Sequence, residues 1–158
     1  VMKLITEDLL KNLNTEAELS LRKRKNYNFH DKLEDPLQRL LNAMEPCTYV
    51  QPHKHESPDK REFFIILKGK AVVVLFNENG DITNHVVLNP QTQNFGVEIP
   101  ERTWHTIIIL QTNTVLFEVK DGPYEVVSDK NFANWAPKEN DPACEEYNNS
   151  ILKRLKLL

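Results

Sequence analysis

The segment Tyr49-Val50-Gln51-Pro52-His53-Lys54-His55 places two histidines one residue apart in a stretch of extended character. In a β-strand, residues i and i+2 point to the same side of the sheet, so the imidazoles of His53 and His55 would project toward one point. Neutral imidazole nitrogens are common metal ligands. This stretch therefore predicts a chelating pair of histidines on a strand.

An acid and a third histidine follow at the starts of two later apolar runs. Glu62 opens one run and His105 opens the other. Three imidazoles with one carboxylate suit Fe, Mn, Ni, Zn or Cu better than Mg or Ca. Glu56 remains an alternative acidic ligand, because a loop of six residues, 56–61, separates Glu62 from the histidine pair. We predict one divalent transition metal with four protein ligands: His53, His55, Glu62 and His105.

The middle of the chain has the pattern of an all-β protein. Short segments rich in β-branched and aromatic residues alternate with turn sequences such as Lys68-Gly69-Lys70 and Asn77-Glu78-Asn79-Gly80-Asp81. This spacing favours an antiparallel barrel or sandwich over a parallel α/β sheet. The predicted strands cover residues 49–55, 62–67, 71–76, 83–88, 95–99, 104–110 and 115–120.

Both ends of the chain favour helices. Residues 4–20 carry helix formers, and Thr15-Glu16-Ala17-Glu18 fits a capping box, which predicts a second short helix or a break near Asn14. Residues 141–158 fit a helix with Asp141 as its N-cap. The length of 158 residues favours a single domain, residues 1–158, with its β core at about 22–138.

The order of metal-type residues resembles the two sequence motifs of the cupin superfamily. These motifs run His-x-His, Glu, Gly, Pro and His, and correspond here to 53–55, Glu62, Gly69, Pro100 and His105. The resemblance implies an all-β cupin jelly-roll barrel, with short N-terminal and C-terminal helical segments, that binds a metal inside.

Further motifs resemble the WbuC-type cupin-fold metalloproteins, which occur among genes for bacterial surface polysaccharide. The resemblance spans about residues 22–138 and implies a role in polysaccharide biosynthesis. The motifs that carry it are residues 39–43, 52–55, 96–100, 122–124 and 135–137.

A second polar pattern precedes the histidine pair. Donor-rich side chains occupy every second position in Arg22, Arg24, Asn26, Asn28 and His30. If this stretch is extended, one of its faces is a ladder of donors that could bind an anionic or hydroxyl-rich ligand. The alternative is a basic, solvated linker. The residues predicted to bind substrate are Arg24, Asn28, His30 and Arg39.

Three titratable residues are candidates for general acid–base catalysis beside the metal: Glu98, Glu118 and His30. Glu98 lies in the predicted strand that leads toward His105, and Glu118 lies in the last long strand. For each glutamate the alternative is a charge on the outer surface of the sheet.

Composition excludes several partners. A net charge of −3 gives no long-range attraction to nucleic acid or to an anionic membrane. No apolar run is long enough to span a bilayer, and residues 2–7 lack the apolar core of a secretory signal. We expect a cytoplasmic protein that binds a small polar molecule. Trp104 would point away from the metal, and its outer sheet face could form a homodimer interface.

These observations leave three functions open. The chain could be a metalloenzyme, namely an isomerase, epimerase or oxygenase of cupin type acting on a sugar or nucleotide-sugar intermediate. It could be a non-catalytic module that binds a carbohydrate or a small acid through its metal. The metal could also be structural, which closed four-coordinate zinc would indicate.

Overall fold

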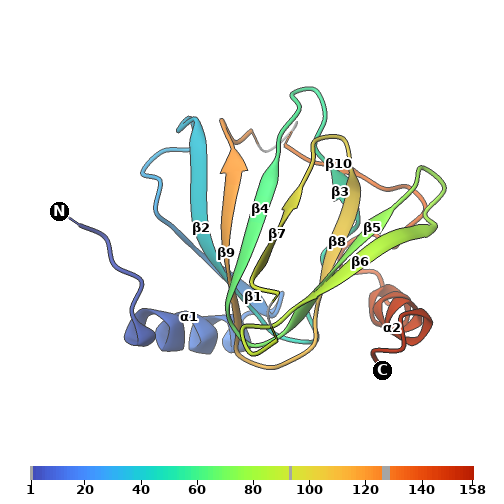
Figure 1. The fold of residues 1–158 in the computed structure, drawn as a ribbon, viewed down its shortest axis with the longest axis horizontal. Coiled ribbons are helices and arrows are strands. Elements are labelled where there is room, and N and C mark those ends of the chain that lie inside the picture. Colours follow the sequence, from blue (N-terminus) through green and yellow to red (C-terminus); the bar gives the residue numbers. More distant parts are fainter. Residues whose placement is uncertain (1, 93, 126–128) are drawn as a thin grey trace.

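The computed structural model describes residues 2–92, 94–125 and 129–158. In this part of the chain two antiparallel sheets of five strands face each other, and a helix lies at each end of the chain (Figure 1). This arrangement confirms the predicted all-β cupin jelly roll with short terminal helices. The helices are α1 (Glu7–Leu19) and α2 (Cys144–Arg154).

The two sheets are formed by strands distant in sequence. The first sheet has the order β1 (Arg24–Asn28), β2 (Leu37–Met44), β9 (Thr114–Asp121), β4 (Glu62–Lys68) and β7 (Gly96–Ile99). The second has the order β10 (Asn131–Phe132), β3 (His53–Lys54), β8 (Trp104–Ile109), β5 (Ala71–Phe76) and β6 (Ile82–Leu88).

The main core lies between the two sheets. Along β4, burial alternates from residue to residue, so that Glu62, Phe64 and Ile66 point inward as predicted. Side chains from both sheets meet them in one apolar cluster, which includes Met44, Val73, Leu88, Ile107 and Leu116. The inward face of β4 therefore carries an acid at its start and apolar packing below it.

The N-terminal helix is continuous, so the predicted break near Asn14 is wrong. Thr6 caps α1, because its Oγ1 accepts a hydrogen bond from the backbone N–H of Leu9 at 3.2 Å. The Thr15 hydroxyl instead donates to the Lys11 carbonyl inside the helix at 3.1 Å. Asn14 is buried against the sheet. Packing thus outweighs the local capping signal at Thr15.

Helix α1 covers the outer face of the first sheet over β2, a strand that the sequence pattern did not predict. Leu10, Leu13 and Ala17 pack with Leu41 and Ala43. Because the core covers one face of β2 and α1 covers part of the other, the strand lacks the apolar–polar alternation of a half-buried strand. The sequence of β2 therefore did not show the pattern by which the other strands were predicted.

Helix α2 begins at Cys144, later than predicted, because Asp141 does not cap it. The Asp141 carboxylate accepts a hydrogen bond from the Ala143 N–H at 2.8 Å, before the first helical turn. Ile151 and Leu152 of α2 pack on the outer face of the second sheet, with Trp104 beside them. The face on which we expected a homodimer is thus partly covered by α2, and the homodimer stays a prediction.

The predicted turns occur where glycine is needed. Gly69 has φ +83° between β4 and β5, and Gly80 has φ +85° between β5 and β6. A Cβ at Gly80 would also lie 2.7 Å from the Trp135 ring, so the turn and the packing both require glycine. Two loops, 55–61 and 100–103, lie together at the upper end of the barrel (Figure 1).

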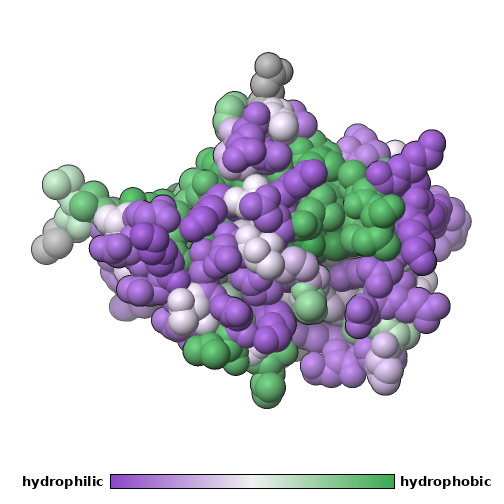
Figure 2. Space-filling model, turned by 90° about the horizontal axis from the view of Figure 1, so that it is seen from below, coloured by the Kyte–Doolittle hydropathy of each residue, from purple (hydrophilic) through white to green (hydrophobic). Residues whose placement is uncertain are grey.

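The surface at the lower end of the molecule is partly hydrophobic. Seen from below, a broad hydrophobic area interrupts a mostly hydrophilic surface (Figure 2). Neither helix among the described residues has the length and apolar character that crossing a membrane requires.

Replacing Ile151 with alanine should destabilise the fold, because this side chain is 3% exposed and seals α2 against the sheet. We expect the free energy of unfolding to fall by about 2–5 kcal/mol, measured by urea denaturation. The control is Lys153→Ala on the exposed side of the same helix, which should change it by less than about 0.5 kcal/mol. Equal stabilities of the two variants would show that α2 is not part of the cooperative fold.

Candidate metal centre

Four metal-type side chains meet between the sheets near the upper end of the barrel. His53 lies on β3, Glu62 starts β4, and the register pairs His53 with His105 on β8. Their ligand atoms and one of His55 all lie within 4.8 Å of one another. Each residue is no more than 3% exposed. The structure therefore brings together all four predicted ligands.

The hydrogen bonds of the imidazoles fix which nitrogen faces the centre. The Nδ1–H groups of His53 and His105 donate to the carbonyls of Gln51 and Thr103 at 2.9 and 2.8 Å. His55 Nδ1 donates in the same way to the Asp129 carbonyl. A carbonyl only accepts, so in each neutral ring Nε2 carries the lone pair.

The centre consequently holds acceptors without donors. His55 Nε2 lies 2.6 Å from Glu62 Oε1, and His105 Nε2 lies 3.0 Å from Glu62 Oε2. Lone pairs on both atoms of such a contact repel, so either a proton or a cation must lie among them. Three nitrogens and a carboxylate, each ring held by a backbone carbonyl, form the donor set of a transition-metal site. The residues present fit a divalent metal.

The surroundings of His53 and Glu62 shift the pKa of each side chain toward the protonation state that binds a metal. Burial lowers the pKa of His53 well below its ordinary value, so the ring stays neutral. Burial alone would raise the pKa of Glu62, but hydrogen bonds and charge from His105 and His55, when a proton occupies their Nε2 atoms, outweigh burial and hold this pKa well below the usual range. Glu62 therefore stays ionised and His53 unprotonated at neutral pH.

Glu56, the alternative acid, lies outside the cluster. Its carboxylate pairs with Lys54 at 3.2 Å, and its backbone carbonyl accepts from Asn131 at 2.9 Å. The loop 56–61 thus keeps Glu56 outside the cluster, whereas Glu62 lies inside it at the start of β4. The geometry favours Glu62 as the acidic ligand.

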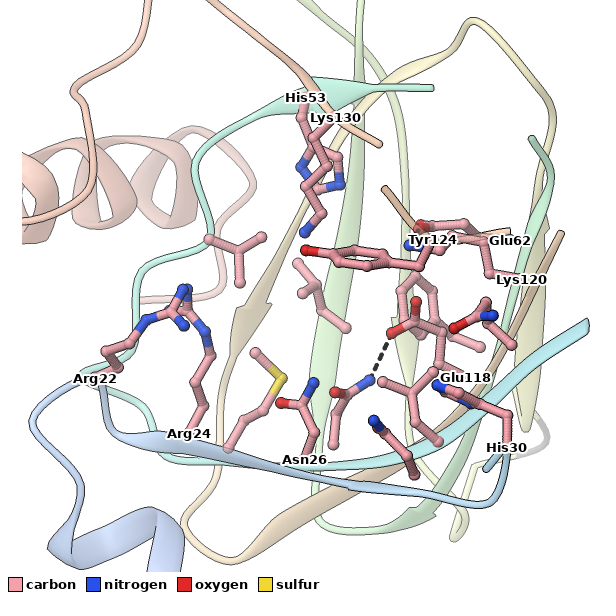
Figure 3. Close-up of a pocket in the computed structure, with 18 of the residues that line it drawn as sticks. Arg22, Arg24, Asn26, His30, His53, Glu62, Glu118, Lys120, Tyr124 and Lys130 are labelled. Atoms are coloured by element: carbon pink, nitrogen blue, oxygen red, sulfur yellow. Dashed lines mark hydrogen bonds and ion pairs between the residues drawn. The ribbon is translucent and has the colours of Figure 1, made fainter. Parts of the chain in front are cut away.

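A cavity of about 350 Å³ opens beside the cluster and is lined by residues of both sheets (Figure 3). Of the four ligand residues, His53 and Glu62 line it. A molecule in the cavity would therefore approach the cluster past these two side chains. Phe64 and Ile107 supply apolar lining.

The donor ladder forms one wall of this cavity. Its middle is strand β1, which confirms the extended conformation, and all five alternate side chains line the cavity: Arg22, Arg24, Asn26, Asn28 and His30. Glu139 pairs with Arg22 at 2.6 Å and with Arg24 at 2.8 Å. Whether the ladder binds substrate stays a prediction.

His30 and Arg39 have different positions. His30 lines the cavity, and its Nδ1 accepts a hydrogen bond from the Arg39 backbone N–H at 3.0 Å. Arg39 is not among the lining residues, and its guanidinium pairs with Asp35 at 3.2 Å. Alternation along β2 turns Gln38 and Leu40 inward and the Arg39 side chain outward, so Arg39 is not placed to contact a ligand there.

The two glutamates proposed as catalytic acid–base groups lie in different environments. Glu98 is exposed on β7, where Val97 and Ile99 instead contact the core, so it is not placed to act as a base. Glu118 lines the cavity and accepts a hydrogen bond from Asn42 at 2.6 Å. Burial first, and then the charge of Glu62, raise the pKa of Glu118. Glu118 can thus hold a proton that an exposed glutamate would release.

Sequence reasoning missed a network of buried charges behind the cluster. Asp129 accepts hydrogen bonds from Lys60 and Lys120, each at 2.7 Å, and its carbonyl accepts from His55. Lys120 Nζ also lies 3.9 Å from Glu62. Lys120 is two residues from Glu118, so strand alternation could have indicated it. No spacing signal links Lys60 to Asp129.

Fold and site together define a cupin-fold protein with a candidate metal centre. Solved structures of similar fold include KdgF from Halomonas sp., at 14% identity and a TM-score of 0.51, over 68% of this chain and 85% of that one. A cupin superfamily protein from Desulfitobacterium hafniense matches at 15% identity and TM-score 0.51, over 69% and 86% of the two chains.

CapF from Staphylococcus aureus, a capsular polysaccharide assembling protein, is 22% identical with a TM-score of 0.56, over 72% of this chain. The match spans 32% of CapF. At these identities the likeness establishes the fold. No curated protein matches the chain. The chain belongs to the family described as a domain of unknown function, DUF6016, whose model matches residues 5–88, more than half of its length.

Removing one imidazole should remove most of the bound metal. We expect His53→Ala and His105→Ala, purified without added metal or chelator, to hold far less metal per chain than the wild type in elemental analysis, because each loses one of four donors. His85→Ala, on the exposed side of β6, is the control and should keep it. Full retention by both cluster variants would refute the metal site.

The two acids can be told apart in the same assay. Glu62→Gln should lose metal, since an amide is a weaker and neutral ligand, whereas Glu56→Gln should retain it. Circular dichroism would show that both variants remain folded. The opposite result would identify Glu56 as the ligand.

Proposed function

We propose that this protein is a metal-dependent enzyme that moves a proton on a small polar metabolite, such as a sugar or a nucleotide-sugar intermediate. The observation that carries the proposal is the pairing of the His/Glu cluster with Glu118 across one cavity. Among the predicted classes, this pairing favours an isomerase, because a single group can take a proton from one carbon and return it to the adjacent carbon on the same face.

Each part of the cavity has a role in this proposal. A divalent metal held by His53, His55, Glu62 and His105 would act as a Lewis acid on a substrate oxygen. Glu118 would exchange a proton with the substrate, and Asn42 would orient its carboxyl group through their 2.6 Å hydrogen bond. The apolar lining from Phe64 and Ile107 would limit water around the reacting atoms.

Two likenesses support a setting in bacterial surface polysaccharide synthesis. The sequence motifs resemble WbuC-type cupin-fold metalloproteins, and CapF, a capsular polysaccharide assembling protein, shares the fold. We therefore propose sugars and nucleotide sugars as the first substrates to test. A small-molecule partner and a cytoplasmic location complete the proposal.

The decisive comparison is Glu118→Gln against Glu98→Gln. Metal-loaded wild-type protein would be incubated with free sugars and nucleotide sugars in D₂O, with isomerisation and solvent deuterium incorporation followed by ¹H NMR and O₂ uptake recorded in parallel. We expect Glu118→Gln to keep its metal but lose about a hundredfold or more in rate, because it cannot exchange the proton. Glu98→Gln carries the same charge change on the outer surface and should match the wild type.

Two results would contradict the proposal. Equal rates for the wild type and Glu118→Gln would remove the acid–base role. Binding of sugars to the metal-loaded wild type without turnover would replace the enzyme with a carbohydrate-binding module.

A further inference from the structure

Lys130 is the one cation lining the cavity, within the described residues, whose charge meets no partner at contact distance. Its side chain is partly buried and points into the cavity beside His53 (Figure 3). No hydrogen bond or ion pair to its Nζ occurs in the described parts of the chain. The other cations there are paired: Arg22 and Arg24 with Glu139, and Lys120 with Asp129.

Among the described residues, the ammonium group of Lys130 has no anionic group at contact distance to balance its charge. Burial lowers the pKa of Lys130, because a buried charge without a contact partner is unfavourable. Lys120 adds repulsion, while Glu62 and Glu118 attract from a distance. A metal beside Glu62 would offset the attraction of that carboxylate. An anion brought in by a ligand would then complete the site.

The β1 wall carries a second set of unused groups. The side-chain amides of Asn26 and Asn28 line the cavity and have no hydrogen-bond partner within the described chain. Asn42, on the neighbouring strand, is by contrast engaged by Glu118. Each free amide offers two donors and one acceptor oxygen, which suits hydroxyl groups. The cavity thus combines one unpaired cation with two unpaired amides.

We propose that the cavity selects a small polyhydroxylated molecule that carries a carboxylate or phosphate group, with Lys130 binding the anion and Asn26 and Asn28 binding hydroxyls. This inference rests on the proposed function in taking the same cavity as the substrate site. It narrows the substrate class to acidic or phosphorylated sugars. Arg22 and Arg24 share the Glu139 carboxylate, which holds both guanidinium groups and balances one of their two charges. Lys130 has no such contact within the described chain, so we assign the anion preference mainly to Lys130.

The test measures binding rather than turnover. Isothermal titration of the full chain would use D-glucose, D-glucuronate and D-glucose 6-phosphate, which share a sugar ring and differ in charge. We expect at least one anionic sugar to bind about tenfold or more tightly than glucose, as a charge-assisted hydrogen bond provides. The preferred anion tells a carboxylate site from a phosphate site.

Three variants show whether Lys130 is responsible. Lys130→Met should abolish the preference for the anionic sugar, and Lys130→Arg should keep most of it because the charge remains. Lys11→Met, an exposed position on α1, removes the same charge at a distance and should leave the preference intact. Circular dichroism would confirm folding. If neither anion binds more tightly than glucose, or if Lys130→Met keeps the preference, the inference is wrong.

Each titration is made on chelator-treated protein and again after metal reconstitution. Anion preference in the chelator-treated protein that depends on Lys130 supports the inference even if no metal binds and the proposed enzyme fails. Metal binding and turnover without any dependence on Lys130 would overturn the inference and leave the proposed function standing. The two failures are therefore distinguishable.

Discussion

The convergence of lone pairs on Glu62 is the constraint on which the rest of the site depends. Backbone carbonyls hold Nδ1 of three imidazoles, so that three Nε2 atoms and two carboxylate oxygens meet with no donor between them. Such an arrangement is unfavourable without a cation or added protons. The strands that supply these groups come from both sheets, so the packing of the barrel holds the site together.

The register of the first sheet extends this constraint into the cavity. Glu62 lies opposite Lys120, and Lys120 in turn binds Asp129, whose carbonyl orients His55. One chain of contacts therefore joins an acidic ligand to the ring of a second ligand. Lys60 shares the Asp129 carboxylate, so two lysines balance the acids behind the cluster. The ion pairs of Asp129 with Lys60 and Lys120 therefore stabilise the cluster in addition to the packing of the sheets.

Local alternation was sufficient to predict much of the fold and site. The phase of β4 places Glu62, Phe64 and Ile66 inward, and the phase of β1 places the donor ladder on one wall. The same rule applied to β7 would have turned Glu98 outward, because Val97 and Ile99 are its apolar positions. Patterns failed where tertiary packing covers both faces, as in β2, or overrides a capping signal, as at Thr15. Lys130 lies just before the two-residue strand β10, and no periodicity indicates where its side chain points.

Strand pairing also explains why Glu118 and Lys120, two residues apart on one face of β9, have opposite roles. Glu118 lies between Leu40 and Phe64 on the neighbouring strands, so an apolar row surrounds it and disfavours its ionised form. Lys120 lies between Gln38 and Glu62, so a polar row stabilises its charge. A shift of β9 by two residues in one direction would place Lys120 in the apolar row, and the same shift in the other direction would place Glu118 in the polar row. The register of β9 therefore decides which group in the cavity can exchange a proton and which remains a fixed charge.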